Sequence, residues 1–194
     1  TIQLKFVFLI LSILLLLPVN GMACGICFLV DPKIYVDLEL TIKNNTLKKI
    51  SVTWEFSEVY SRNSIISGDT NRDGKLSTLE LKKLEYSFLK ELGIRNLHTY
   101  FGLDTVPAPI TASQTTNTQL KLIKNRIYLS YDITTSNPLA EQAQVNMLLH
   151  DERKFFKFLL REDLIKVTSD VNWKIAEDSK LYGDVTEIRL TRMD

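Results

Sequence analysis

The chain has 194 residues, enough for one ordinary domain with a sizeable core but too few for two comfortable ones. Its formal net charge is +1, and the sequence has no basic patch interleaved with aromatic residues, which argues against nucleic acid as a partner. We therefore expect one globular domain preceded by an N-terminal extra segment.

The N-terminal segment has the pattern of a secretory signal peptide. An almost unbroken apolar run from Phe6 to Val19 follows Lys5, and small residues stand at Gly21 and Ala23. A membrane-spanning helix needs about 20 apolar residues, and polar or helix-breaking residues interrupt this run at its end. We predict a signal peptide over residues 1–23 and an exported protein, periplasmic or on the outer face of the membrane. The alternative is a retained membrane anchor, uncleaved or lipidated.

Two cysteines, Cys24 and Cys27, follow the leader as Cys-Gly-Ile-Cys. They could close a small disulfide loop in an oxidising compartment. Cys24 could also be the lipidated first residue of a bacterial lipoprotein, although Gly21 stands where such signals usually carry Leu. A zinc site would need two more ligands, for which the chain offers only His98 and His150. We expect a pair that flanks the leader and has no catalytic role.

The pattern from Lys33 onward is typical of a half-buried β-hairpin. Apolar residues occupy every second position from Ile34 to Ile42, with polar or aromatic residues between them. Asn44-Asn45-Thr46 supplies turn residues, and Ile50 to Phe56 follows as the second strand.

A twelve-residue stretch from Asp69 to Glu80 has the ligand spacing of an EF-hand calcium loop. Oxygen-bearing side chains stand at loop positions 1, 3, 5, 9 and 12. Gly74 at position 6 supplies the sharp bend, and position 7 needs to offer only its carbonyl. The predicted calcium ligands, in loop order, are Asp69, Asn71, Asp73, Lys75, Ser77 and Glu80.

Apolar periodicity on both sides of the loop predicts a helix-loop-helix insert at about residues 57–92. Ser57 or Ser61 can cap the entering helix, which ends at Gly68. The exit helix stops at Gly93 and places four apolar residues on one face, namely Leu81, Leu84, Phe88 and Leu92. EF-hands usually pair, and no second loop follows. We therefore expect this one to pack on a sheet and to hold a structural calcium ion rather than to act as a switch.

Short strands separated by turns are predicted for the rest of the chain. Asn96 to Leu103 is expected to be extended and Thr111 to Gln119 to be a polar loop. A second hairpin is predicted over Gln119 to Lys124 and Arg126 to Ile133, followed by a turn at Asn137-Pro138. Further short strands are expected over 143–149, 154–160, 164–168, 171–175 and 185–190. A helix that begins at Asp151 and contains Phe155, Phe156 and Phe158 is a local alternative.

These elements together indicate the fold class. Several short strands at this spacing are typical of an antiparallel β-sandwich or a curled sheet. We therefore predict a mainly β (α+β) single domain over residues 31–194, with the helix-loop-helix EF-hand inserted between its second and third strands.

No sequence motif indicates an enzyme. The chain has no Gly-rich phosphate loop, no Gly-x-Ser-x-Gly elbow and no His-Glu-x-x-His. His150-Asp151-Glu152 contains groups that could act as an acid and a base, but a His beside two acids is more often the solvated end of a strand or helix. We expect His98 to be a structural side chain and the protein to be non-catalytic.

Several segments resemble one known family. They are the strand I-Y-V-D-L-E-L, the run S-V-T-W-E-F-S-E-V-Y-S before the calcium loop, N-L-H-T-Y-F, and the late segment L-L-H-D-E-R-K-F-F-K-F. Over roughly Asp31 to Ile175 the chain looks like the bacterial periplasmic family known as domain of unknown function one thousand and seven. The sharpest parts are Trp54-Glu55-Phe56 with Tyr60, Asp69 to Glu80, and Asp151 to Phe158. Members are often encoded beside ABC-type or nickel/cobalt transport genes, so the resemblance implies a transport-associated accessory role.

One departure from the family pattern bears on a second metal. Members commonly begin the first strand with His-Pro-His, whereas this chain has Asp31-Pro32-Lys33.

The sequence as a whole leaves two candidate functions. The first is an exported, non-catalytic calcium-binding accessory protein that associates with a membrane transporter component of an ABC-type or metal transport system. The second is a periplasmic carrier of nickel, cobalt or zinc that uses Cys24, Cys27 or the histidines.

Overall fold

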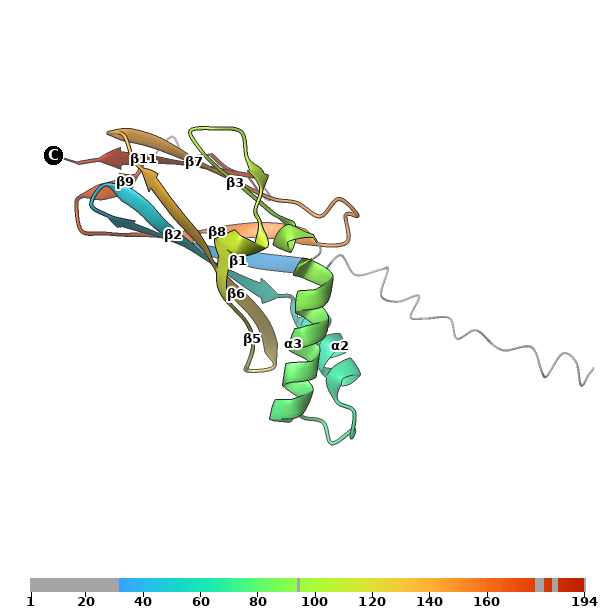
Figure 1. Ribbon diagram of the computed structural model, residues 1–194. Helices are drawn as coiled ribbons and strands as arrows, with labels where there is room; N and C mark the ends of the chain where they lie inside the picture. The colour runs from blue at the N-terminus through green and yellow to red at the C-terminus, as the bar shows by residue number, and fades with distance from the viewer. Residues whose placement is uncertain (1–31, 94, 177–179, 183–184, 194) are drawn as a thin grey trace, which may run out of the picture. The chain divides into compact units, whose positions relative to one another are not determined.

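The structure, a computed structural model, describes residues 32–93, 95–176, 180–182 and 185–193 (Figure 1). The predicted signal peptide (1–23) and Cys24 and Cys27 lie outside these described residues. The described elements, with η for 3₁₀-helical turns, are β1 (Lys33–Lys43), β2 (Thr46–Phe56), α2 (Glu58–Gly68), α3 (Thr78–Gly93), η1 (Asn96–His98), β3 (Thr99–Leu103), β4 (Ala108–Pro109), η2 (Ala112–Gln114), β5 (Thr115–Ile123), β6 (Arg126–Pro138), β7 (Gln142–Leu149), β8 (Lys157–Ser169), β9 (Trp173–Ile175), β10 (Lys180–Tyr182) and β11 (Val185–Arg192).

The predicted first hairpin is confirmed as the antiparallel pair β1 and β2. Every second residue of β1, from Ile34 to Ile42, is buried, as the alternating pattern requires. Asn44 and Asn45 between the strands have φ of 51° and 50°, the left-handed conformation of a type I′ turn. This turn type matches the right-handed twist of the two strands, and Asn tolerates it better than most residues.

The described strands form two sheets. The first has the strand order β5-β6-β2-β1-β8, and the second has the order β10-β11-β7-β3-β4 with β9 beside β11. The fold is therefore mainly β with two helices, as predicted. The expectation of purely antiparallel pairing is wrong at one place, because β8 lies parallel to β1, with Lys33 opposite Lys157. The chain leaves β7 in the second sheet and crosses to the first at the end where β1 starts, so both strands run in one direction.

Side chains from both sheets contribute to one hydrophobic core. The ring of Trp54 on β2 is fully buried, 5.1 Å from Phe158 on β8 and 5.7 Å from Tyr131 on β6. The second sheet adds buried aliphatic residues from β7 and β11, namely Ala143, Val145, Met147, Leu149, Ile188 and Leu190. The hydroxyls of Tyr131 and Thr99 lie 2.6 Å apart in a buried hydrogen bond that joins β6 of the first sheet to β3 of the second.

Several local predictions differ from the structure. Residues 115–119 belong to β5 rather than to a loop, because a register shift between Thr116 and Gln119 lets the polar segment keep its pairing with β6. Asn137-Pro138 is not a turn, since β6 continues to Pro138 opposite Thr46. The stretch predicted as extended from Asn96 begins with the turn η1, and only Thr99–Leu103 is a strand.

No helix begins at Asp151. Its carboxylate instead accepts the backbone N–H groups of Arg153, Phe155 and Phe156 at 3.1, 2.9 and 3.0 Å, which closes a turn. The chain then enters β8, a single strand that covers both short segments predicted over 154–160 and 164–168.

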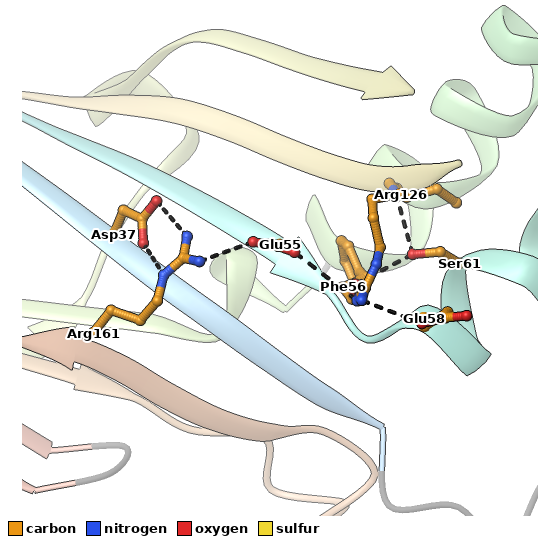
Figure 2. A network of polar contacts seen from close by, with 8 residues as sticks. Asp37, Glu55, Phe56, Glu58, Ser61, Arg126 and Arg161 are labelled. Carbon is orange, nitrogen blue, oxygen red and sulfur yellow. Dashed lines mark hydrogen bonds and ion pairs between the residues drawn. The ribbon is translucent and has the colours of Figure 1, made fainter. Parts of the chain in front are cut away.

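A ladder of charged side chains crosses the face of the first sheet opposite the core (Figure 2). Arg161 on β8 donates to the two carboxylate oxygens of Asp37 on β1 at 2.6 Å each, and to Glu55 on β2 at 2.9 Å. Arg126 on β6 lies 3.9 Å from Glu55 and 3.5 Å from Glu58 on α2. The ladder therefore connects β8, β1, β2 and β6 to the first turn of α2.

Ser61 ties α2 to the same sheet. Its hydroxyl is buried, donates to the Phe56 carbonyl at 3.2 Å and accepts the N–H of Ile127 at 3.1 Å (Figure 2). One side chain thus satisfies backbone groups at the end of β2 and the start of β6, which holds the helix against both strands.

Replacing Arg161 by Met is expected to lower the free energy of unfolding by about 1–2 kcal/mol at neutral pH. The change leaves Asp37 and Glu55, diagonal neighbours on paired strands, without the cation between them. Urea unfolding measures the loss. Arg161→Lys should recover only part of it, because an ammonium cannot reproduce the two parallel bonds to Asp37. Coincident unfolding curves for wild type and Arg161→Met would contradict this role.

Candidate metal loop and its surroundings

The predicted calcium loop connects α2 to α3, between β2 and β3 in the chain. The helices are attached to the first sheet through Tyr60 on α2 and Phe88 on α3, whose rings lie 5.1 and 5.5 Å from Phe56. Leu92 near the end of α3 is buried in the core. In Figure 1 the loop lies at the end of the two helices that is remote from the strands. The expected packing of this insert on a sheet is confirmed at the helix ends, while the loop itself is largely exposed.

Backbone hydrogen bonds hold the first half of the loop. Asp69 accepts the N–H groups of Asp73 and Gly74 at 3.2 and 2.8 Å, and the Asn71 side-chain oxygen accepts the N–H of Asp73 at 3.0 Å. Asp73 in turn accepts the N–H of Lys75 at 2.9 Å. Gly74 has φ of +82°, a conformation that strains any residue with a Cβ. The predicted sharp bend is therefore present, with the oxygen-bearing side chains of positions 1, 3 and 5 bound to its backbone.

Glu80 closes the loop. Its Oε1 accepts the N–H and hydroxyl of Thr70 at 2.8 and 2.7 Å and the N–H of Asn71 at 3.3 Å. Its Oε2 accepts the N–H and hydroxyl of Ser77 at 2.9 and 2.7 Å. Glu80 is only 5% exposed, and these donors, those of Ser77 first, lower the pKa of its carboxyl to about 2. One carboxylate therefore joins the two ends of the loop.

The same contacts form a capping box for α3. Ser77 precedes the first helical residue, its hydroxyl accepts the N–H of Glu80 at 3.3 Å, and Glu80 accepts the N–H of Ser77. The spacing Ser-x-x-Glu is a sequence-level signal for this cap. Sequence reasoning used the two residues only as calcium ligands and missed their second role.

The donor set fits a calcium ion in kind. Three carboxylates, at Asp69, Asp73 and Glu80, stand with amide, hydroxyl and carbonyl oxygens in one loop, which is the ligand chemistry of a hard cation. Among the described residues, no three His, Cys, Asp or Glu side chains are grouped so that they could hold a metal ion. Binding would require the hydroxyls of Thr70 and Ser77 to turn away from Glu80, since they now occupy its oxygens.

Leu76 at loop position 8 packs against the end of α2. A Cβ added to Gly68 would lie 3.2 Å from Leu76 Cδ2 and 3.6 Å from Leu84 Cδ2, so both leucines cover the end of α2. The apolar residue of the loop is thereby partly buried by the two helices that flank it. Leu76 therefore contacts the helices on both sides of the loop.

A second cluster of interest contains His98 and Asp151. The prediction that His150-Asp151-Glu152 is a solvated end is wrong for Asp151, which is 3% exposed. His98 is equally buried, its Nδ1 lies 3.8 Å from Asp151 Oδ1, and the rings of Phe156 and Phe158 lie 6.1 and 6.2 Å from the imidazole. The backbone N–H of His150 donates to the His98 carbonyl at 2.8 Å. The structural role expected for His98 agrees with this burial.

The backbone before His98 is strained. Asn96, Leu97 and His98 have φ of 50°, 50° and 48°, a left-handed turn of three consecutive non-glycine residues. Thr99 holds this turn, because its hydroxyl donates to the Leu97 carbonyl at 2.7 Å and is also bonded to Tyr131. The segments N-L-H-T-Y-F and L-L-H-D-E-R-K-F-F-K-F, far apart in the sequence, therefore meet at one buried point.

Replacing His98 by Phe is expected to reduce the acid sensitivity of the fold. Burial lowers the pKa of His98 more than the Asp151 carboxylate raises it, with Arg95 and Arg153 nearby also lowering it. The unfolded chain, whose histidine pKa is about 6.5, then binds a proton before the folded one does. Stability conferred by neutral His98 is therefore lost as the pH falls below about 6.5, by at most about 1.4 kcal/mol per pH unit.

Urea unfolding at neutral pH and at about pH 5, which lies below the histidine pKa of the unfolded chain, measures this slope. The wild type should lose more stability than His98→Phe over this interval. Asp151 contributes to the pH dependence of stability only at lower pH. Burial raises the pKa of its carboxyl, but the hydrogen bonds from the N–H groups of Phe156 and Arg153 outweigh burial, so the pKa is lowered overall. Equal slopes for the two proteins would show that His98 is not the titrating group.

None of the helices within the described part of the chain is long and apolar enough to cross a membrane.

A family model described as protein of unknown function (DUF1007) matches residues 31–175. This range contains the predicted calcium loop, the His98–Asp151 cluster and all strands from β1 to β9. A search of curated proteins found no match.

Proposed function

Because the chain belongs to the DUF1007 family, whose description states no function, we propose from its own residues that it is an exported, non-catalytic calcium-binding accessory protein. Calcium would be held by the loop from Asp69 to Glu80. The observation that carries this proposal is the hydrogen-bonded ring of the loop, in which Asp69 binds the bend and Glu80 joins both ends.

The loop supports a structural ion rather than a switch. Its bend is already formed by backbone bonds to Asp69 and Asp73, and Leu76 already packs on the flanking helices. We expect binding to need new side-chain orientations at Thr70, Ser77 and Glu80, because the two hydroxyls now occupy the carboxylate oxygens. We expect the calcium affinity to lie at the weak end of the EF-hand range, with a dissociation constant of about 10⁻⁴ to 10⁻³ M. The reason is that Arg72 and Lys75 partly offset the three carboxylates, and no second calcium loop follows in the sequence.

Such an affinity suits an extracytoplasmic location. At roughly millimolar calcium and a dissociation constant near 0.1 mM, binding adds about 1.4 kcal/mol of stability, whereas at cytosolic submicromolar calcium it adds almost nothing. This agrees with the export signal predicted at residues 1–23. The accessory role beside an ABC-type or metal transport system is the part of the proposal that comes from the family resemblance.

Calcium at about 1 mM is expected to raise the melting temperature by about 3–6 °C over that in chelator. Asp73→Asn should weaken this response, since it removes a ligand charge but keeps an oxygen that can accept the N–H of Lys75. Asp163→Asn, which changes an exposed carboxylate on β8, is the matched control and should respond like the wild type. Glu80→Gln should abolish the response, and it should also lower stability in chelator because it disturbs the cap of α3.

Thermal melts with calcium, magnesium and chelator make this measurement. A wild-type melting temperature that is the same in calcium and in chelator would remove the basis of the proposal.

Metal analysis tests the competing role as a carrier of nickel, cobalt or zinc. We expect no stoichiometric transition metal in the exported protein, because the imidazoles among the described residues are limited to His98, which is buried, and His150. Intact mass should be read on the same sample, since the cleavage position decides whether Cys24 is free, lipidated or absent. Stoichiometric transition metal that is lost in Cys24→Ser would establish the carrier instead.

A further inference from the structure

The outward face of α3 carries an unusual combination of side chains. Five exposed residues lie along one stripe of the helix at spacings of three, four, seven and eleven from the first, and we call them the α3 stripe: Leu79, Lys82, Lys83, Tyr86 and Lys90. Leu79 is 64% exposed and Tyr86 is 69% exposed, so the apolar members are not shielded by the rest of the described protein. The helix therefore presents two large apolar side chains among three ammonium groups.

The acidic residues of α3 do not neutralise this stripe. Glu80 is held inside the loop, and Glu85 accepts the backbone N–H of Leu120 at 2.8 Å. Glu91 is bonded to Arg95 and Arg153 at 3.3 and 2.9 Å. Each carboxylate thus has another partner.

The lysines themselves are unpaired. Within the described residues, Lys82, Lys83 and Lys90 take part in no ion pair. The charged groups of the α3 stripe are therefore all cationic, although the helix also carries three carboxylates. A face of this kind is complementary to an anionic surface.

The shape of the stripe favours a flat partner over a peptide. It lies on the convex side of a single helix and extends about 17 Å from Leu79 to Lys90. Peptide recognition uses grooves or free sheet edges, and this face offers neither. Figure 1 shows that the end of α3 next to the loop extends past the strands of the first sheet.

The side-chain chemistry matches the headgroup region of a membrane. Tyrosine combines an apolar ring with a polar tip and is enriched at membrane interfaces. Lysine places its aliphatic stem along apolar surface while its ammonium stays in water beside phosphate. Leu79 and Tyr86 between such lysines can enter the interface while Lys82, Lys83 and Lys90 bind lipid phosphates.

We propose that the α3 stripe docks the protein on an anionic phospholipid surface, with the helix lying parallel to the membrane plane. The docking does not depend on calcium in the neighbouring loop, since all five residues belong to the helix and not to the ligand set. Docking would leave the remaining surface of the two sheets free to contact the membrane transporter component of the proposed function.

Vesicle co-sedimentation tests the proposal with the exported protein, its N-terminus verified by intact mass and identical in all variants. Binding to phosphatidylglycerol-phosphatidylcholine vesicles is compared with binding to pure phosphatidylcholine, in chelator and at low salt. Chelator separates this experiment from the calcium proposal and prevents calcium from bridging lipid phosphates. The wild type should bind the anionic vesicles preferentially, and added salt should release it.

Two stripe variants and one control locate the binding surface. Each lysine near an anionic surface contributes about fivefold to binding, so Lys82→Glu/Lys83→Glu/Lys90→Glu should lower the partition coefficient at least about tenfold. Leu79→Ser/Tyr86→Ser should lower it severalfold without changing net charge. The control Lys43→Glu/Lys48→Glu/Lys166→Glu makes the same charge change at exposed positions of β1, β2 and β8 and should change binding less than about twofold.

Circular dichroism confirms that each variant is folded, and Lys82→Gln/Lys83→Gln/Lys90→Gln replaces the charge-reversed protein if that one is not. Unchanged vesicle binding by the stripe variants would overturn the proposal. An equal loss in the control would also overturn it, because net charge alone would then explain binding. Binding to polyglutamate without binding to anionic vesicles would show an acidic protein partner in place of the membrane.

Discussion

The aromatic rings around Phe56 hold three separate parts of the chain at one point. Phe56 ends β2, and its ring lies 5.1 Å from Tyr60 on α2, 5.5 Å from Phe88 on α3 and 6.0 Å from Phe156 in the turn before β8. Aromatic pairs of this kind each contribute about 0.5–1.5 kcal/mol beyond the area they bury. Together with the Ser61 hydrogen bonds on α2 and the buried Leu92 on α3, this cluster holds the helices against the first sheet. Phe156 directly precedes β8, so the same cluster lies beside the start of the strand that pairs in parallel with β1.

The loop between α2 and α3 places three carboxylates within twelve residues, and the folded protein must tolerate them when no cation is bound. Backbone N–H groups at the bend stabilise Asp69 and Asp73, and the cap of α3 stabilises Glu80. The loop is therefore ordered by its own hydrogen bonds, which is why we propose a calcium ion that adds stability rather than one that shapes the loop.

The buried pair of His98 and Asp151 solves a similar problem inside the core. A left-handed turn of three non-glycine residues costs about 1–2 kcal/mol for each of them, and the contacts of Thr99, Tyr131 and Asp151 hold the chain there. These residues connect β3 to β6 and to the turn that leads into β8. The segments on which the family resemblance rests are therefore, in this chain, largely the parts that lock the two sheets and the helices together.

Sequence alone determined the elements whose cause is local. Residues within a few positions of one another are enough to produce four of the predicted features. These are the alternation from Ile34 to Ile42, the turn with two asparagines, the bend at Gly74 and the buried apolar face of α3. Only the tertiary structure decided the parallel pairing of β8 with β1, the burial of Asp151 and the unpaired lysines beside Leu79 and Tyr86. Each of these depends on partners more than fifty residues away, or on carboxylates being bonded elsewhere, as Glu91 is to Arg153. A pattern along the chain records which side chains can be buried, but not which distant group will meet them.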